Sequence, residues 1–190
     1  ETLKDLFQTE GVIALQSGLT YAQFLKKKYA PVKAKLVPYQ GGISYIQNPG
    51  PNAQQGFLTS EPLVAEKAGI KVKTFLVADE GFNPYTTVLA VRKKDLDKDP
   101  AKFTALVNAV RTGWEHYLRN PAKAHEIMQA LNKSMDAETF KQSAAAQKSL
   151  IDTPVIGEMK ENRWVTLIDQ LKEFKTIKKK VNASKQFQNL

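Results

Sequence analysis

Two short segments carry most of the side chains in this sequence that could do chemistry. The first runs from Thr59 to Glu61 and follows an apolar run, and the second runs from Gly81 to Tyr85. Together they offer hydroxyl, carboxylate, amide and aromatic groups, and ligands bind at the ends of strands in open α/β sheets. Neither segment contains a catalytic motif. The pattern predicts a site that holds a small polar molecule without transforming it.

Glu61 is the first candidate ligand-binding residue. A carboxylate at the start of a helix is favoured by the helix dipole, and it can accept two hydrogen bonds from the edge of an aminopyrimidine. The same position would also suit a residue that only caps its own helix before Pro62. Thr59 and Ser60 could donate or accept hydrogen bonds at the same rim, or they could serve as caps.

Two earlier loops supply further candidates. The turn from Ser17 to Thr20 offers backbone N–H groups at the start of a helix, where an anion can bind, and Thr20 is the expected N-cap. Tyr39, Gly41 and Gly42 follow the second predicted strand. The two glycines would let a ligand approach the backbone, although a plain turn explains them equally well.

The second segment offers rings and an amide. Phe82 or Tyr85 could stack on a planar ligand while Asn83 bonds its edge. The alternative is that this segment plugs a hinge, with Pro84 stiffening the crossover.

Composition excludes several classes of protein. The absence of cysteine removes disulfides, thiolate zinc sites and cysteine nucleophiles. Neither a nucleophile elbow, a P-loop nor a His-Glu-x-x-His motif is present, so no enzyme and no cofactor are expected. His116 and His125 lack partners at metal-ligand spacing, so we expect them to be surface or packing residues and expect no metal site. Trp114 and Trp164 lie on helical stripes, so we expect both in the core and not at a ligand.

Charge and length further narrow the classes of protein to which the chain could belong. The 190 residues suit one large domain or two small lobes, no apolar run reaches the ~18 residues of a membrane span, and no signal peptide is visible. The net charge of +9 favours anionic solutes or surfaces. The dense basic runs are Lys26–Lys28 and Lys178–Lys180. Neither interleaves arginine with aromatic residues, so nucleic-acid binding is not expected.

The hydrophobic pattern divides the chain at about residue 92. Before it, short strands alternate with helices, which predicts a largely parallel sheet. After it, only amphipathic helices are predicted, and the chain offers no obvious sheet for their apolar faces. The predicted strands are 12–15, 34–37, 55–58, 72–77 and 86–91, and the predicted helices are 21–29, 43–46, 63–68, 101–118, 121–130, 136–150 and 162–174.

Several of these segments together resemble the solute-binding proteins of bacterial ABC importers. The most similar group takes up thiamine-pyrimidine precursors, nitrate, sulfonates and taurine. The resemblance extends from Leu3 to about Val181, and it depends on the order and spacing of the motifs. They are Thr59–Pro62, Gly81–Tyr85, Gly113-Trp114 with Tyr117, and Ile156–Met159 with Arg163-Trp164.

The resemblance implies a type II periplasmic binding fold, in which two α/β lobes joined by crossing strands close on the ligand. Residues 1–92 would be the three-layer α/β lobe two with crossing strands. Residues 93–190 would be the C-terminal helices of lobe one, which would be incomplete because its opening part is missing from this sequence. Helices without their sheet would expose apolar faces and invite self-association.

The function implied is capture of a small pyrimidine-like or other nitrogenous solute for an ABC permease. The protein would be periplasmic, or lipid-anchored at the outer face of the cytoplasmic membrane. The alternatives are a sulfonate, nitrate or taurine-type anion, or a non-transport interaction module. One eukaryotic branch of the superfamily synthesises the thiamine pyrimidine with a cysteine-rich motif and an active-site histidine. Because this chain has no cysteine, that activity is not expected.

Overall fold

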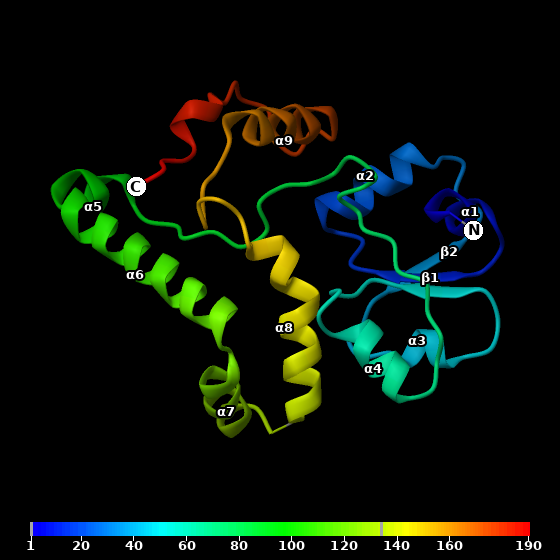
Figure 1. Cartoon of the computed structure of the whole chain (residues 1–190). Coiled ribbons are helices and arrows are strands. Elements are labelled where there is room, and N and C mark those ends of the chain that lie inside the picture. The colour runs from blue at the N-terminus through cyan, green and yellow to red at the C-terminus, as the bar shows by residue number, and fades with distance from the viewer. Residues whose placement is uncertain (1, 134) are drawn as a thin grey trace. The chain divides into compact units, whose positions relative to one another are not determined.

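The chain folds into a mixed α/β structure with a small parallel sheet and many helices (Figure 1). The computed structural model describes residues 2–133 and 135–190. It comprises two compact units, the first made of residues 1–84 and 164–181 and the second of residues 85–163 and 182–190. The predicted α/β class is confirmed, and it is consistent with a periplasmic-binding-protein-like fold.

The sheet lies in the first unit and has the strand order β2-β1-β3. The central strand β1 (Val12–Leu15) pairs in parallel with β2 (Lys35–Pro38) and with β3 (Asn52–Gln54). Most of β1 is buried, as expected for an apolar strand with a neighbour on each side. Leu15 is opposite Pro38, and Ala14 is opposite Gln54, so the carboxyl ends of all three strands meet at one edge.

The core of the first unit forms where two helices cover this sheet. Helix α1 (Leu3–Gln8) begins with a capping box between Thr2 and Asp5, and helix α2 (Thr20–Lys28) follows β1. The short helix α3 (Ser44–Gln47) follows β2, and α4 (Glu61–Lys67) follows β3. The core side chains are Phe7, Ile13, Leu15, Ala22, Leu25, Tyr29 and Ala34.

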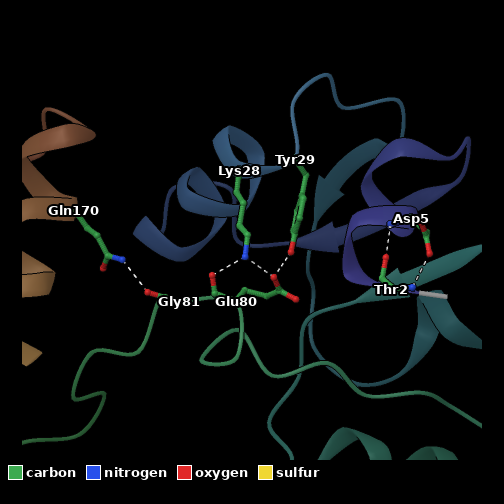
Figure 2. A network of polar contacts seen from close by, with 7 residues as sticks. All are labelled: Thr2, Asp5, Lys28, Tyr29, Glu80, Gly81 and Gln170. Atoms are coloured by element: carbon green, nitrogen blue, oxygen red, sulfur yellow. Dashed lines mark hydrogen bonds and ion pairs between the residues drawn. The ribbon is translucent and has the colours of Figure 1, made fainter.

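A polar network fastens the segment around residue 80 to α2 (Figure 2). Lys28 Nζ donates to the Glu80 carbonyl oxygen at 2.7 Å and lies 2.6 Å from Glu80 Oε2, and the Tyr29 hydroxyl donates to the same carboxylate. In the same unit, Gln170 of helix α9 (Glu161–Glu173) donates to the Gly81 carbonyl oxygen at 2.9 Å. An irregular segment of the chain is therefore held by contacts that come from two helices.

The second unit is helical. Its helices are α5 (Lys93–Lys98), α6 (Pro100–Arg119), α7 (Ala122–Leu131), α8 (Ala137–Ile151) and the 3-10 turn Ala183–Lys185. Side chains of Asp99 and Asp136 cap α6 and α8 by accepting from the backbone N–H groups of Lys102 and Thr139. Within the described residues, neither α6 nor α7 contains a buried side chain.

Most predicted elements are present with their ends shifted by a residue or two, but four predictions are wrong. The third strand covers residues 52–54 instead of 55–58. Segments 72–77 and 86–91 are irregular, because neither forms a ladder with a strand in the described residues. The N-cap of α2 is Leu19 and not Thr20, and Leu19 has no side-chain oxygen with which to cap.

The two units do not follow the chain as two consecutive halves. Residues 164–181 group with the sheet-containing unit, where the ring of Phe174, the residue after α9, meets that of Phe24 at 6.3 Å. The assignment of residues 1–92 and 93–190 to two lobes stays a prediction.

Candidate functional site

The candidate site is the edge of the sheet at which the three parallel strands end. The loop after β1 contains Ser17 and reaches Thr20, and the loop after β2 contains Tyr39, Gly41 and Gly42. The loop after β3 leads to Glu61. Because the strands are parallel and in register, these loops are neighbours at one edge.

Glu61 links two of these loops. Its Oε1 accepts a hydrogen bond from the Tyr39 hydroxyl at 2.6 Å, and its Oε2 accepts one from the Phe57 backbone N–H at 2.7 Å. A carboxylate offers about four acceptor positions, so two partners leave it able to accept further donors. Glu61 therefore holds the loop before its own helix in place and retains the capacity to bind a ligand.

Gly56 makes this arrangement possible. A Cβ atom at residue 56 would lie 3.0 Å from the Glu61 Cβ and 3.1 Å from Oε2. Such contacts are tighter than nearly all those that Cβ atoms make, so a larger residue would require the Glu61 side chain to shift by a few tenths of an ångström. The glycine thus allows the Glu61 side chain to fold back against the loop.

Tyr39 is held as a hydrogen-bond donor. Burial, and then the hydrogen bond and negative charge of Glu61, raise the pKa of the Tyr39 hydroxyl to about 12. At neutral pH the hydroxyl is therefore protonated, and its proton points to Glu61. This fixes one oxygen of the carboxylate in the site.

Three glutamines at the same edge were missed by sequence reasoning. The backbone N–H of Gln16 donates to Gln55 Oε1 at 2.7 Å, and Gln55 Nε2 donates back to Gln16 Oε1 at 3.1 Å. The Tyr21 hydroxyl also bonds to Gln55 Oε1. The signal that could have found them is an amide residue directly after each of two neighbouring strands.

Gln54, the third glutamine, presents an oxygen without a partner. Its Nε2 donates to the Gly42 carbonyl oxygen at 2.6 Å, while its Oε1 is buried and has no hydrogen-bond partner among the described residues. The φ angles of Gly41 and Gly42 are +88° and +65°, values that favour glycine, and this explains why two glycines occur in succession in this loop. Buried acceptors are nearly always satisfied, so Gln54 Oε1 is a place for a water or a ligand donor.

The remaining predicted residues of this edge lie at the starts of the helices. Ser17 is exposed, and Thr20 is the first residue of α2. Ser60 is the N-cap of α4 without a side-chain cap hydrogen bond, and Thr59 precedes it in the turn. The structure thus brings Ser17, Thr20, Tyr39, Gly41, Gly42, Thr59, Ser60 and Glu61 to one edge.

The residues of the second predicted segment, Gly81–Tyr85, lie in different surroundings. Phe82 is only 7% exposed, and its ring packs on Phe24 at 5.5 Å, which suits the alternative packing role. Asn83 is exposed. Tyr85 belongs to the second unit, where its hydroxyl accepts from the Lys160 N–H at 2.7 Å and its ring lies 3.8 Å from the Arg163 guanidinium. That Asn83 and Tyr85 act together with Glu61 stays a prediction.

The histidines and tryptophans lie on helices of the chain. His125 Nε2 is 3.0 Å from the Tyr117 hydroxyl, and its ring stacks on Phe140. The Trp114 ring meets Tyr117 edge-on but is 38% exposed, so its predicted core position is wrong. The described residues contain no cluster of metal-ligating side chains, and none of their helices has the length and hydropathy to cross a bilayer.

A comparison with known families points in the same direction as the site. Residues 33–124 match the family model described as "NMT1/THI5 like", which is just under half of the chain. That range contains every predicted ligand-binding residue except Ser17 and Thr20. No curated protein matches the chain. The family includes solute-binding proteins of ABC importers for nitrate, sulfonates and thiamine precursors, as well as a pyrimidine synthase. The match supports a relation between this chain and the solute-binding proteins.

Proposed function

We propose that this chain is a solute-binding protein of an ABC importer that captures a small nitrogenous heterocycle, such as a thiamine-pyrimidine precursor, without chemistry. The observation that carries the proposal is the Glu61 carboxylate, which Tyr39 and Phe57 fix at the edge where three strands end. The family match to residues 33–124 supports the same class of protein. The protein would work in the periplasm, or on a lipid anchor, and deliver its solute to permease subunits.

The chemistry of the edge suits an aminopyrimidine. The free acceptor positions of Glu61 can take two N–H donors from the edge of the ring, and Gln54 Oε1 can take a third. Phe57 lies in the loop between β3 and Glu61, and it is 73% exposed while Glu61 accepts a hydrogen bond from its backbone N–H. An exposed ring on a fixed backbone is suited to stack on a planar ligand.

An anionic solute is the second candidate. The net charge of +9 would attract a sulfonate or nitrate ion over a long range. Backbone N–H groups at the start of α2, next to Ser17 and Thr20, are the kind of donors that anions take. Glu61 distinguishes the two candidates, because a carboxylate repels an anion and attracts an amine.

Calorimetric titration of the purified chain with an aminopyrimidine and, separately, with taurine tests the proposal. We expect the aminopyrimidine to bind and Glu61→Gln to weaken it by about 10-fold to 100-fold, since hydrogen bonds to charged groups contribute about 1.5–3 kcal/mol. Glu66→Gln, an equal change on the exposed face of the same helix, is the control and should bind as the wild type does.

Three results would overturn the proposal. If neither ligand binds, the chain is not a receptor for either class of solute. If the aminopyrimidine binds Glu61→Gln as well as it binds the wild type, the site is elsewhere. If taurine alone binds, and Glu61→Gln strengthens it, the anionic candidate replaces the heterocycle.

A further inference from the structure

Two lysine runs that are far apart in the sequence belong to the same unit of the structure. Lys26–Lys28 ends α2, and Lys178–Lys180 follows the end of α9. The ends of these helices are in contact, because Lys27 Nζ lies 2.5 Å from Glu173 Oε1 and 5.8 Å from the centre of the Phe174 ring. The chain then folds back on α9, where the Thr176 N–H donates to the Leu171 carbonyl oxygen at 2.9 Å.

Exposed lysines in the last turn of α2, in the last turn of α9 and in the segment that follows α9 flank this contact along the chain, and we call them the basic strip. Two acidic residues adjoin it, and each is paired: Glu173 with Lys27, and Asp169 with Lys172 at 3.5 Å. In the described residues, no carboxylate pairs with the other lysines of the strip. The members of the strip are Lys26, Lys27, Lys172, Lys175, Lys178, Lys179 and Lys180, all exposed.

Lys28 does not belong to the strip, although it continues the first run. Its ammonium group is turned to Glu80 (Figure 2), and the hydrogen bond from Lys28 raises its own pKa and lowers the pKa of Glu80. A charge that is already satisfied within the protein contributes little to a partner. The two runs therefore differ in what they offer: Lys178–Lys180 is wholly available, and Lys26 is the unpaired member of the first run.

We propose that the basic strip docks this protein on the anionic phospholipid headgroups of a bilayer. Each lysine near such a surface contributes about 1 kcal/mol, and lysine stems can extend their charged ends into the headgroup layer. The strip contains lysine and no arginine, so it offers point charges and lacks the planar forks that read one ligand geometry. Neighbouring rings Phe24 and Phe174 pack on each other, so they do not form a platform on which bases could stack.

The position of the strip at helix ends also favours a plane of charges over a single tightly held anion. Both α2 and α9 end here, and the carboxyl end of a helix repels anions that approach its backbone. Only the lysine ammonium groups, at the ends of their long side chains, can then contact phosphates. This inference depends on the charges and not on the Glu61 site.

Sedimentation with lipid vesicles tests the inference. We expect the chain to bind vesicles that contain about a third phosphatidylglycerol, to leave pure phosphatidylcholine unbound, and to lose binding as salt screens the charges. Lys178→Gln/Lys179→Gln/Lys180→Gln should lower the partition coefficient on the order of 100-fold, at about fivefold for each lysine. Lys26→Gln should lower it by about fivefold.

The matched control removes three lysines elsewhere. Lys94→Gln/Lys98→Gln/Lys102→Gln, in α5 and α6 of the second unit, changes the net charge equally and should leave vesicle binding within about twofold of the wild type. Thermal unfolding followed by circular dichroism, and the aminopyrimidine titration, should not change in either triple variant.

Four outcomes would overturn the inference. Equal binding to neutral vesicles would mean that the chain does not recognise the charge of the headgroups. Equal effects of the two triple variants would mean that only the net charge of the chain matters, and not the position of the lysines. If Lys26→Gln binds the vesicles as tightly as the wild type does, then Lys178–Lys180 act without α2. Binding to duplex DNA that exceeds binding to the vesicles, and that falls in the same strip variants, would assign the strip to nucleic acid.

Discussion

At the scale of single residues, Glu61 shows why sequence reasoning left two roles open. The sequence predicts a carboxylate at a helix start, and it predicts that such a group either caps the helix or binds a ligand. In the structure Glu61 reaches back to the Phe57 N–H, four residues earlier, and across to Tyr39 in another loop. The partner in the other loop could not be predicted, because it depends on the sheet order, in which β2 and β3 lie on either side of β1.

The first prediction concerns the pH dependence that Tyr39 confers. Because its folded pKa of about 12 is above the ordinary value of 10.0, folding binds a proton more tightly at this hydroxyl. The stabilisation is complete below pH 10 and is lost as the pH rises from about 10 to about 12. We expect Tyr39→Phe to remove this part of the alkaline loss of stability, measured by urea unfolding across that pH range.

A matched variant serves as the control for this prediction. Tyr45→Phe removes a hydroxyl that donates to the Pro38 carbonyl oxygen at 3.3 Å instead of to a carboxylate. Its unfolding should follow the wild-type pH dependence. If Tyr39→Phe loses stability above pH 10 as steeply as the wild type, then Glu61 does not hold the Tyr39 proton.

At the scale of elements, the central strand could be predicted from the sequence. Two segments that pair with no strand were wrongly predicted to be strands. The run 12–15 is found as predicted because a buried apolar strand with parallel neighbours has a strong signal. Segments 72–77 and 86–91 have the β-branched composition of strands, but composition does not supply a neighbour. Strand β3 begins three residues before the predicted third strand. The reason is that Ala53 and Gln54, and not Phe57, pair with residues of β1.

Helix ends followed local rules where a side chain could cap. Asp136 caps α8 as its spacing to Thr139 predicts, and Pro121 precedes α7 as expected. The start of α2 differs because Leu19, which cannot accept a hydrogen bond, has the extended backbone of an N-cap. Two short helices, α1 and α5, were not predicted, since six residues carry too little periodicity to recognise.

The second prediction is that Glu80 fastens the irregular segment 77–82 to α2. Hydrogen bonds from Lys28 and then Tyr29 lower the folded pKa of Glu80 below its ordinary 4.5. Its stabilisation is therefore present above about pH 4.5 and is lost as the pH falls through the lowered folded pKa. We expect Glu80→Gln to speed amide hydrogen exchange in residues 77–82 at pH 7, and to make stability less sensitive to acid.

Asp79→Asn is the control for this prediction, because Asp79 is the exposed neighbour of Glu80 in the same turn. Its exchange rates and its acid dependence should match those of the wild type. Exchange in Glu80→Gln that is no faster than in Asp79→Asn would mean that the aromatic packing of Phe82 holds the segment without the ion pair.

At the scale of the whole molecule, the second unit leaves apolar surface uncovered. Leu106, Val110 and Trp114 recur every four residues along α6, so they share one face, and they are 44%, 36% and 38% exposed. On α7, Ile127, Met128 and Leu131 are also exposed. An exposed apolar stripe along one helix face is a candidate interaction surface. The sequence predicted apolar stripes without a sheet to cover, and the structure describes these stripes as exposed.

The last prediction is that the chain associates with itself through this face of α6. We expect sedimentation velocity to show a weight-average mass that rises with protein concentration, because burying apolar area releases about 25 cal/mol per Å². Leu106→Glu/Val110→Glu should return the chain to a monomer, since it places two charges inside the contact. Ala105→Glu/Thr112→Glu adds the same charge to the opposite, exposed face of α6 and should associate as the wild type does. If both double variants associate equally, the contact does not use this face, and if the wild type stays monomeric at every concentration, the exposed stripe does not drive assembly of this chain.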